Sequence, residues 1–258
     1  MEPTATPSKQ AVQAQFSKAA AAYAKSGVHA GGADLDAMLA AAAPRGSERV
    51  LDLGSGAGHT SLFFAPHVVE VHALDLCEPM LEQGRRLATE RRLPNLSWHR
   101  GDAEALPFGR DHFDLVTSRQ SAHHYHDLDA VLREVARVLT PGGRFVVVDS
   151  VAPEDDARDT FLNTFEVLRD PLHVRDHRVS EWCRRLASVG LEPEPGPRFW
   201  LDMDFAPWVE RSATPAAAID ALRTLVRRAP LEVREPFFPD APACSRVRLE
   251  VALVLGRA

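Results

Sequence analysis

An apolar run that ends in three closely spaced glycines constrains this chain most. Residues 50–58 read VLDLGSGAG, so a segment typical of a β-strand is followed by glycines at 54, 56 and 58. Glycines so placed indicate that the backbone itself must approach a ligand, because larger side chains would block it. A helical pattern begins near Thr60, which predicts a strand, a tight turn and a helix. Such a turn presents backbone N–H groups and the positive end of a helix to a polar or anionic group.

Two acids follow at the ends of the next two predicted strands. The strand over residues 68–74 ends in Asp75, about 20 residues after the glycine turn, where a carboxylate can accept hydrogen bonds from a ribose. The strand over 96–100 runs into Asp102. Because parallel strands end on one rim of a sheet, both acids should lie near the glycine turn. Alternatively, Asp75 caps the next helix and Asp102 is a turn residue.

Strands and helices alternate over the middle of the chain. Strands are predicted over residues 50–53, 68–74, 96–100, 113–118 and 144–149, and helices over 58–65, 79–91 and 127–139, after two N-terminal helices over 9–25 and 34–43. This alternation predicts an α/β fold with a parallel sheet and helices on both faces. Ligands of such sheets bind beyond the carboxyl ends of the strands.

The pattern changes after the strand that ends at Asp149. A charged helix is predicted over about 152–170, a loop with His and Arg over 171–179, a helix over 179–189, and strands over 191–201 and 247–255 with a helical insertion around 207–228 between them. The last two strands should therefore pair with each other although the helical insertion separates them in the sequence.

A glycine turn and two acids on one rim suit a ligand that contains adenosine. Backbone amides would hold its polar tail, Asp75 its ribose and Asp102 its adenine amino group, with Leu76 and Ala103 on the faces of the purine. A nicotinamide dinucleotide site requires the pattern G-x-G-x-x-G. Here the third glycine comes one residue early, and such a site needs no partner like Asp102.

This arrangement resembles the class I S-adenosylmethionine-dependent methyltransferases. The block over residues 132–149, LREVARVLTPGGRFVVVD, is typical of their small-molecule members and is most similar to the ubiquinone/menaquinone-biosynthesis type. The similarity is dense from about Phe16 to Gly190. It implies that the cofactor is S-adenosylmethionine and that the product is S-adenosylhomocysteine.

The resemblance also implies a Rossmann-like, seven-stranded, mostly parallel sheet with an antiparallel last strand. A helical lid at the N-terminus and a cap insertion after the fifth strand belong to the same expectation. The chain is then one methyltransferase domain over 1–258, with the lid over 1–45, the cofactor-binding core over 46–150, the cap over 151–180, and the rest of the sheet over 181–258.

The cofactor-site candidates gather around the glycine turn and the two acids. They are Asp52, Gly54, Ser55, Gly56, His59, Asp75, Leu76, Met80, Gly101, Asp102, Ala103, Arg119 and, from the lid, Tyr23. Phe16 in the lid is better explained by core packing.

Three histidines within four residues follow the fourth strand, where the transferred methyl group would lie. Imidazole titrates near neutral pH, so His123 or His124 is our candidate for the general base. We favour His124, although the two roles can be exchanged. Alternatively, one ring orients the other or packs under the cap. We predict no metal site, because adjacent histidines point in divergent directions and His126 and Asp127 fix no further ligand.

The acceptor-site candidates lie in and near the predicted cap. Related enzymes carry a stretch similar to residues 161–175, with the pattern F-x-N-x-x-E-x-x-R-D-P-x-H-x-R. The candidates are His29, Asn163, Glu166, Arg169, His173 and Arg175. The two arginines would fix an anionic or carbonyl-rich acceptor. Alternatively, the polar residues form the solvated face of a helix.

Composition excludes several classes of protein. The formal net charge of -6 without a basic run disfavours nucleic-acid partners. No apolar run approaches the roughly 18 residues of a membrane span, and the N-terminus has no apolar signal segment, so we expect a cytoplasmic protein. Three widely separated cysteines predict neither disulfides nor a Cys metal site. Abundant arginine and alanine suggest a bacterial source, and a homodimer stays open.

The sequence as a whole predicts an enzyme that moves a methyl group from S-adenosylmethionine to a small organic acceptor. The methylated atom would be carbon or oxygen of a quinone-like, aromatic or secondary-metabolite scaffold. A second hypothesis is a protein of the same fold that binds S-adenosylmethionine in a non-methylating role such as cyclisation. A nicotinamide oxidoreductase is the third and is disfavoured by the glycine spacing.

Overall fold

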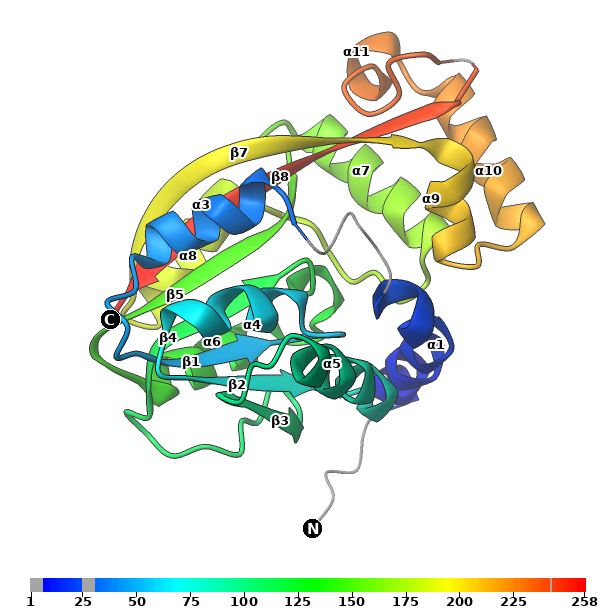
Figure 1. The fold of residues 1–258 in the computed structure, drawn as a ribbon. Helices are drawn as coiled ribbons and strands as arrows, with labels where there is room; N and C mark the ends of the chain where they lie inside the picture. Colours follow the sequence, from blue (N-terminus) through cyan, green and yellow to red (C-terminus); the bar gives the residue numbers. More distant parts are fainter. Residues whose placement is uncertain (1–6, 25–30, 242) are drawn as a thin grey trace.

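The computed structural model describes residues 7–24, 31–241 and 243–258 and has a mixed sheet at its centre (Figure 1). The strands are β1 (Arg49–Leu53), β2 (Glu70–Asp75), β3 (Leu96–Arg100), β4 (Phe113–Arg119), β5 (Leu139–Ala152), β6 (His177–Arg178), β7 (Glu192–Asp204) and β8 (Arg246–Arg257). Their order is β3-β2-β1-β4-β5-β8-β7. Strands β1 to β5 are parallel, and β8 runs antiparallel to both β5 and β7.

The predicted Rossmann-like fold is confirmed, with one correction to the number of strands. The seven expected strands form the continuous sheet, and an eighth strand, β6, pairs in parallel with the end of β5 off this path. Strand β6 was not predicted, because a strand of two residues has no periodicity in the sequence. The two C-terminal strands also reach further towards the helical insertion than predicted. Beyond the ends of β1 to β5, β7 and β8 continue as a pair (Figure 1).

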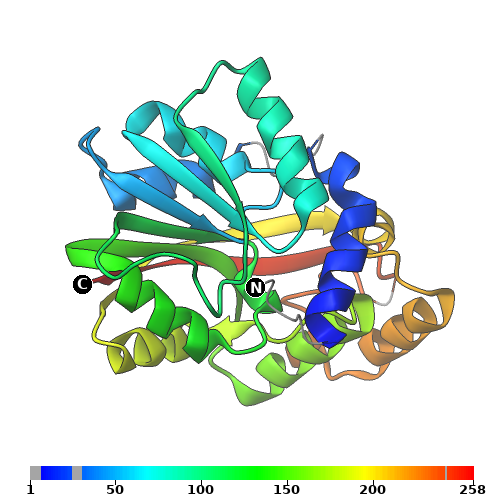
Figure 2. The ribbon, with the colours of Figure 1, turned by 90° about the horizontal axis from the view of Figure 1, so that it is seen from below.

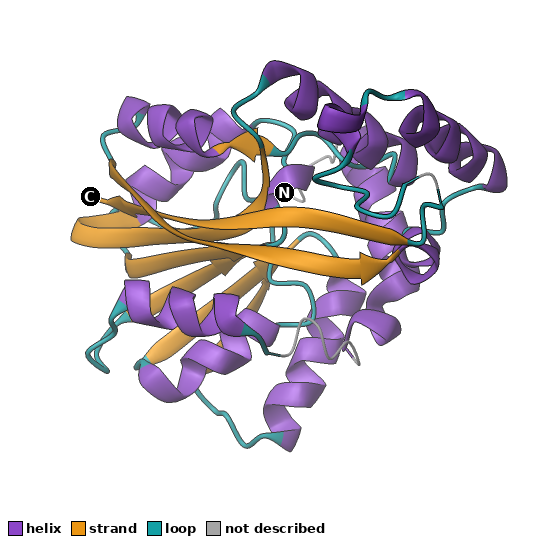
Figure 3. Cartoon of the chain, turned by 90° about the horizontal axis from the view of Figure 1, so that it is seen from above, coloured by secondary structure: helices purple, strands orange, loops and turns teal. Residues whose placement is uncertain are grey.

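Helices cover both faces of the sheet (Figure 3). They are α1 (Pro7–Ala24), α3 (Ala33–Ala42), α4 (His59–Phe64), α5 (Glu78–Glu90), α6 (Leu128–Val138), α7 (Asp156–Arg169), α8 (Val179–Ser188), α9 (Phe205–Arg211), α10 (Ala216–Arg228) and α11 (Leu231–Arg234), with short 3-10 turns η1 (Ala65–His67) and η2 (Ala122–His124). None of the helices in the described part of the chain is long and apolar enough to cross a membrane.

Strand β1 shows how the sequence produces this layered core. Its side chains alternate across the sheet, so Leu51 and Leu53 join the core under α6 and α8, and Val50 joins the core under α3 and α4. Both faces of a parallel sheet are covered, which is why the strand is apolar on both sides. In the register of the sheet, Leu53 lies beside Leu74 of β2 and Ser118 of β4. The segments that follow these three strands therefore meet on one rim.

A second apolar cluster forms beyond that rim, where α7, α9 and α10 pack against the far ends of β7 and β8. Phe165, Trp208, Phe237 and Phe238 are fully buried there. Helix α1 lies across the carboxyl ends of the strands, beside α5 and next to the end of α7 (Figure 2). The sheet rim, the aromatic cluster and α1 thus surround one region of the molecule.

Candidate active site

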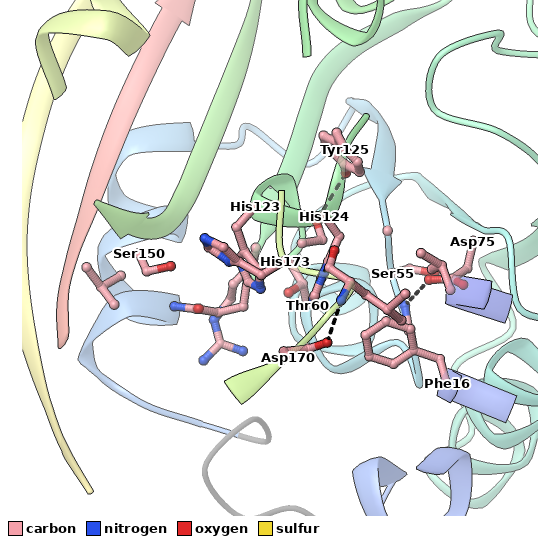
Figure 4. A pocket seen from close by; sticks show the side chains of 18 of the residues that line it. Phe16, Ser55, Thr60, Asp75, His123, His124, Tyr125, Ser150, Asp170 and His173 are labelled. Atoms are coloured by element: carbon pink, nitrogen blue, oxygen red, sulfur yellow. Dashed lines mark hydrogen bonds between the residues drawn. The ribbon is translucent and has the colours of Figure 1, made fainter. Parts of the chain in front are cut away.

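A cavity of about 880 Å³ occupies this region. Its walls come from the glycine turn, the ends of β2, β3 and β4, helix α1, the end of α7, and strands β7 and β8. Figure 4 shows its centre, with Ser55 and Asp75 on one side, Ser150 on the other, and His123, His124 and His173 between them. Volumes of this size are ordinary for small-molecule sites.

The glycine turn has the backbone conformation that its sequence demands. Gly54 and Gly56 have φ angles of 59° and 53°, a left-handed region that costs other residues about 1–2 kcal/mol. A Cβ atom at Gly54 would lie 2.7 Å from Ser121, whereas a Cβ atom at Gly56 would meet no protein atom within 4 Å. Because Gly56 lines the cavity, that open space is where a ligand can touch the backbone.

Asp75 fixes the shape of this turn. Its Oδ2 accepts a hydrogen bond from the backbone N–H of Gly56 and its Oδ1 from that of Cys77, both at 2.8 Å. Burial raises the pKa of the Asp75 carboxyl, while the two N–H groups oppose the rise. The carboxylate therefore lies at the cavity wall between β1 and β2, with lone pairs left for a ribose diol.

Asp102 also lines the cavity, and it is held by the N-terminal helix. Lys9 Nζ of α1 lies 2.6 Å from Asp102 and 2.5 Å from Glu104, and this ammonium is largely buried. The two carboxylates raise the pKa of Lys9, although desolvation lowers it. Gln13 of the same helix donates to the carbonyl oxygen of Leu76 at 3.2 Å. Helix α1 thus touches the segments that follow both β2 and β3.

The prediction for Asp52 needs correction. Its carboxylate lies beneath the turn and not on the cavity wall, where it accepts hydrogen bonds from Ser61 at 2.5 Å and Thr117 at 2.8 Å. It ties β1 to α4 and β4, so its part is to hold the turn in place. Burial raises the pKa of Asp52 to about 6, against the two hydroxyl hydrogen bonds.

The other cofactor-site candidates mostly line the cavity. These are Gly54, Ser55, Gly56, His59, Asp75, Leu76, Met80, Gly101, Asp102, Ala103 and Arg119. The Tyr23 side chain lies outside the described part of the structure, and so does His29. Phe16 packs against a buried apolar cluster, as expected, and it also lines the cavity, where its ring lies edge-on to His124 with ring centroids 5.3 Å apart.

His123 forms an ion pair with a buried carboxylate. Its Nδ1 donates to Oδ1 of Asp149 at 2.6 Å, and Asp149 is 2% exposed. Although desolvation lowers it, the neighbouring Asp149 raises the pKa of His123 to about 9. Among the described residues nothing hydrogen-bonds Nε2 of this ring, which lines the cavity.

His124 has the opposite surroundings. Its Nδ1 donates to the backbone carbonyl oxygen of Leu172 at 3.1 Å, so the lone pair of the neutral ring is on Nε2. Burial and the adjacent charge of His123 lower the pKa of His124 to about 3. The two ring centroids are 4.2 Å apart. The sequence could not separate these rings, whereas their different surroundings in the structure shift the two pKa values in opposite directions.

Asp149, the partner of His123, was not among the predicted site residues. It ends the fifth predicted strand on the same rim as Asp75 and Asp102, so the rule that identified those acids could have identified it. Tyr125 was also missed, and its hydroxyl hydrogen-bonds Ser118 at 3.2 Å and Ser121 at 3.1 Å. Burial raises the pKa of this tyrosine, which keeps its hydroxyl protonated.

One group of side chains in the described structure has the spacing of a metal site. Ligand atoms of His123, Asp149 and Asp176 lie within 4.8 Å of one another. Asp149, however, already accepts from the backbone N–H groups of Ser121, Ala122, His123 and Ser150 as well as from the imidazole. A carboxylate has about four lone-pair sites, so Asp149 has none left for an ion. The absence of a metal stays a prediction.

The acceptor-site candidates divide into two groups. Glu166, Arg169 and His173 line the cavity, with Arg169 2.8 Å from Glu166 and 5.1 Å above the ring of Trp208. The predictions for two others need correction. Asn163 lies behind His173, where its Oδ1 accepts from that ring, and Arg175 points away to pair with Asp159 at 2.8 Å. Neither lines the cavity.

The ion pair of His123 predicts a specific pH dependence of stability. A folded-state pKa of about 9 lies above the ordinary value of 6.5, so the stabilisation is complete below about pH 6.5 and is lost as the pH rises through 9. We expect the unfolding free energy of the wild type to fall over this range by up to about 3 kcal/mol more than that of His123→Gln. Chemical denaturation at both pH values measures this, with the exposed His67→Gln as control. Equal pH dependence in His123→Gln would contradict the ion pair.

Comparison with known proteins gives a consistent result. The family described as "Methyltransferase domain" matches residues 51–147. The methyltransferase YcgJ of Bacillus subtilis (strain 168) is 40% identical to this chain over 222 residues, which are 86% of this chain and 88% of YcgJ. The crystal structure of YcgJ matches with a TM-score of 0.83 and 37% identity, over 87% of this chain and 97% of that chain.

Two further similarities are less informative, because one covers a smaller part of the chain and the other has low sequence identity. The ubiquinone/menaquinone biosynthesis C-methyltransferase UbiE of Ruegeria sp. (strain TM1040) is 38% identical over 138 residues, which are 52% of this chain and 55% of UbiE. The cyclase SpnF matches in structure with a TM-score of 0.58 and 20% identity, over 86% of this chain and 79% of that chain. The second similarity shows the fold alone.

Proposed function

The chain belongs to the S-adenosylmethionine-dependent methyltransferases, and from this premise we propose that it methylates carbon or oxygen of a quinone-like, aromatic or secondary-metabolite acceptor. One observation carries the proposal. A single cavity runs from the glycine turn and Asp75 at one end, past His123 and His124, to Ser150 at the other (Figure 4). A methyl donor held at the first end would present its reacting group to an acceptor at the second.

The cofactor end of the cavity fits an adenosyl sulfonium compound. The open space over Gly56 would take the methionyl part, and the carboxylate of Asp75 would accept from the ribose hydroxyls. Asp102 would accept from the adenine amino group, with Leu76 and Ala103 on the two faces of the ring. When bound, S-adenosylmethionine supplies an electrophilic methyl group.

The other end of the cavity fits a small acceptor with an apolar body. Leu201, Met203 and Trp208 line it, together with Leu249 and Val251 of β8. Glu166 and Arg169 supply polar groups beside the histidines. Alignment of the nucleophile with the methyl group in such a closed site accounts for much of the rate of a displacement reaction, and a base adds about 10²–10⁴-fold where the nucleophile is protonated.

Two measurements test the proposal in sequence. Isothermal titration with S-adenosylhomocysteine should show saturable binding at a one-to-one ratio, and NADH should show none. S-Adenosylmethionine with a carbon-14 methyl group is then incubated with a naphthohydroquinone, a catechol and a simple phenol. We expect label in at least one organic product together with an equal amount of S-adenosylhomocysteine.

The outcomes separate the hypotheses. Binding with conversion of an acceptor but no S-adenosylhomocysteine would favour the non-methylating role, such as a cyclisation. The absence of any S-adenosylhomocysteine binding would overturn the assignment of the cavity itself.

A further inference from the structure

We propose that the two adjacent histidines have different roles towards a methyl acceptor that reacts as an oxyanion. His124 takes the proton of a phenol or enol, and His123 donates a hydrogen bond from Nε2 to the oxygen that becomes negative. Asp149 is the positioning residue that keeps His123 in this role. The inference rests on the proposed function and narrows the acceptor to one chemical class.

Asp149 is built into the fold as a fixed anion. Its Oδ2 accepts from the backbone N–H groups of Ser121 at 3.1 Å, Ala122 at 2.6 Å and His123 at 3.3 Å. Its Oδ1 accepts from the backbone N–H of Ser150 at 2.8 Å. So many donors hold the carboxylate ionised, although it is almost completely buried. The same contacts fix the turn that carries His123.

This anchor determines which edge of the His123 ring meets a ligand. Because Nδ1 faces Asp149, which lies behind the cavity wall, Nε2 on the opposite edge is left for the cavity. Beside a fixed carboxylate the ring is an imidazolium, and both of its nitrogens are then donors. His123 can therefore stabilise negative charge, but it has no lone pair with which to accept a proton.

The His124 ring is anchored by a neutral acceptor instead. The carbonyl oxygen of Leu172 takes the proton on Nδ1, and Phe16 packs against the ring from α1. No carboxylate hydrogen-bonds His124 among the described residues, and a cationic ring lies directly beside it. A buried neutral imidazole with its lone pair on Nε2 can accept a proton, but its lowered pKa makes it a weak base, so the hydrogen bond from His123 must first make the acceptor more acidic.

The charged groups around both rings support this division. His123 faces Asp149 of β5, Glu166 of α7 and Asp176 before β6, which all raise its pKa. His124 faces the cation of His123 and the ring of His173, which lower its pKa, and Asp170, which raises it. Pairs of titratable groups whose surroundings push their pKa values apart are typical of acid and base partners.

The pair suits an acceptor with an acidic proton conjugated to an oxygen. The O–H or C–H proton passes to Nε2 of His124, and the oxygen of the phenolate or enolate accepts from Nε2–H of His123. The electron pair of the acceptor's oxygen or carbon forms the bond to the methyl carbon as the carbon–sulfur bond breaks and its electrons stay on sulfur. His124 then releases its proton to water. A neutral amine develops no negative charge on oxygen during methylation, so the Nε2–H of His123 would have no oxyanion to stabilise.

Nitrogen-15 NMR of histidine side chains tests the two charge states directly in the wild type. The protein is labelled at histidine, bound to S-adenosylhomocysteine, and titrated, with His123→Gln and His124→Asn used to assign the signals. We expect His123 to carry protons on both nitrogens at neutral pH and to titrate near 9, and His124 to stay neutral with its proton on Nδ1. A neutral His123 at neutral pH, or a protonated His124, would overturn the inference.

The variant Asp149→Asn tests the positioning role, with Asp176→Asn as the matched control. We expect the titration of His123 to move from about 9 towards the ordinary 6.5 in Asp149→Asn. A smaller shift is expected in Asp176→Asn, because the contact to Nδ1 remains. If Asp149→Asn does not fold, the titration of His123 and His124 in the wild type still tests the two charge states. An unchanged His123 titration in folded Asp149→Asn would refute the positioning role.

A failure of this inference can be distinguished from a failure of the proposed function. S-Adenosylhomocysteine affinity is measured on each NMR sample. Binding with exchanged histidine states refutes the division of roles alone, whereas loss of binding in the wild type refutes the methyltransferase site. Preference for amines over phenols and enols in the acceptor panel would also contradict the acceptor class.

Discussion

Methyl transfer to the best phenol or hydroquinone acceptor should fall by about 10²–10⁴-fold when His124 is replaced by asparagine. The affinity for S-adenosylhomocysteine should change by less than about twofold, since His124 makes none of the contacts that we propose for the cofactor at the glycine turn, Asp75 and Asp102. The loss is expected in the maximal rate, because a base acts in the transition state and not in the binding of the ground state.

Asparagine is the informative replacement at this position. Its amide N–H can still donate to the carbonyl oxygen of Leu172, which preserves the anchor of the turn, but its side chain has no basic nitrogen. Loss of rate in His124→Asn therefore reports the loss of the base.

His67→Asn is the matched control, since His67 is exposed in η1 and does not line the cavity. We expect the control to keep the full rate. His123→Gln should lose rate as well, through the missing hydrogen bond to the oxyanion. If His124→Asn retains the wild-type maximal rate at every pH from about 6 to 9, His124 is not the base.

Much of the fold could be predicted from the sequence because its signals are local. The apolar run before Gly54 and the alternation of strands and helices each depend on neighbouring residues, and parallel pairing then follows from the short crossovers. The same logic located Asp75 and Asp102, since any acid that ends a parallel strand lies on the ligand rim. Both line the cavity beside the glycine turn.

The errors arose where a helix face or a core contact decides the direction of a side chain. Asn163 shares the polar pattern of Glu166, yet α7 turns it towards Asp176 behind the cavity wall. Arg175 lies in the irregular segment before β6 and pairs with Asp159 and Glu181. Asp52 is buried in β1, where hydrogen bonds from Ser61 and Thr117 hold its carboxylate beneath the turn. None of these directions is encoded in residue type, because they depend on packing between distant segments.

The contact between Lys9 and Asp102 also depends on packing between distant segments, which the sequence does not reveal. The sequence predicted a helical lid at the N-terminus, but it carried no signal that pairs residues 93 positions apart. Long-range ion pairs of this kind become visible only when the helix is placed against the sheet. The opposite pKa shifts of His123 and His124 were hidden for the same reason, since their hydrogen-bond partners come from β5 and from the segment after α7.

Replacement of Gly56 by alanine should weaken the binding of S-adenosylhomocysteine by about 5- to 150-fold, which follows from a misfit of about 1–3 kcal/mol for one extra methyl group in a closely packed contact. The Cβ atom would enter the open space of the cavity and not the protein core. A bound ligand that uses the backbone of the turn must then move away from it. The folded protein should lose only the cost of a left-handed alanine, about 1–2 kcal/mol.

Gly190→Ala separates these two effects. Gly190 has a φ of 84°, and a Cβ atom there also meets no protein atom within 4 Å, but it follows α8 away from the cavity. Both variants should therefore lose similar stability in thermal or chemical unfolding, while only Gly56→Ala loses affinity in isothermal titration. Gly54→Ala should behave differently from both, because its Cβ atom would press on Ser121 beneath the turn and lower stability further. Equal affinities of Gly56→Ala and Gly190→Ala would show that the cofactor does not lie against the glycine backbone, and the placement of the methyl donor would have to be abandoned.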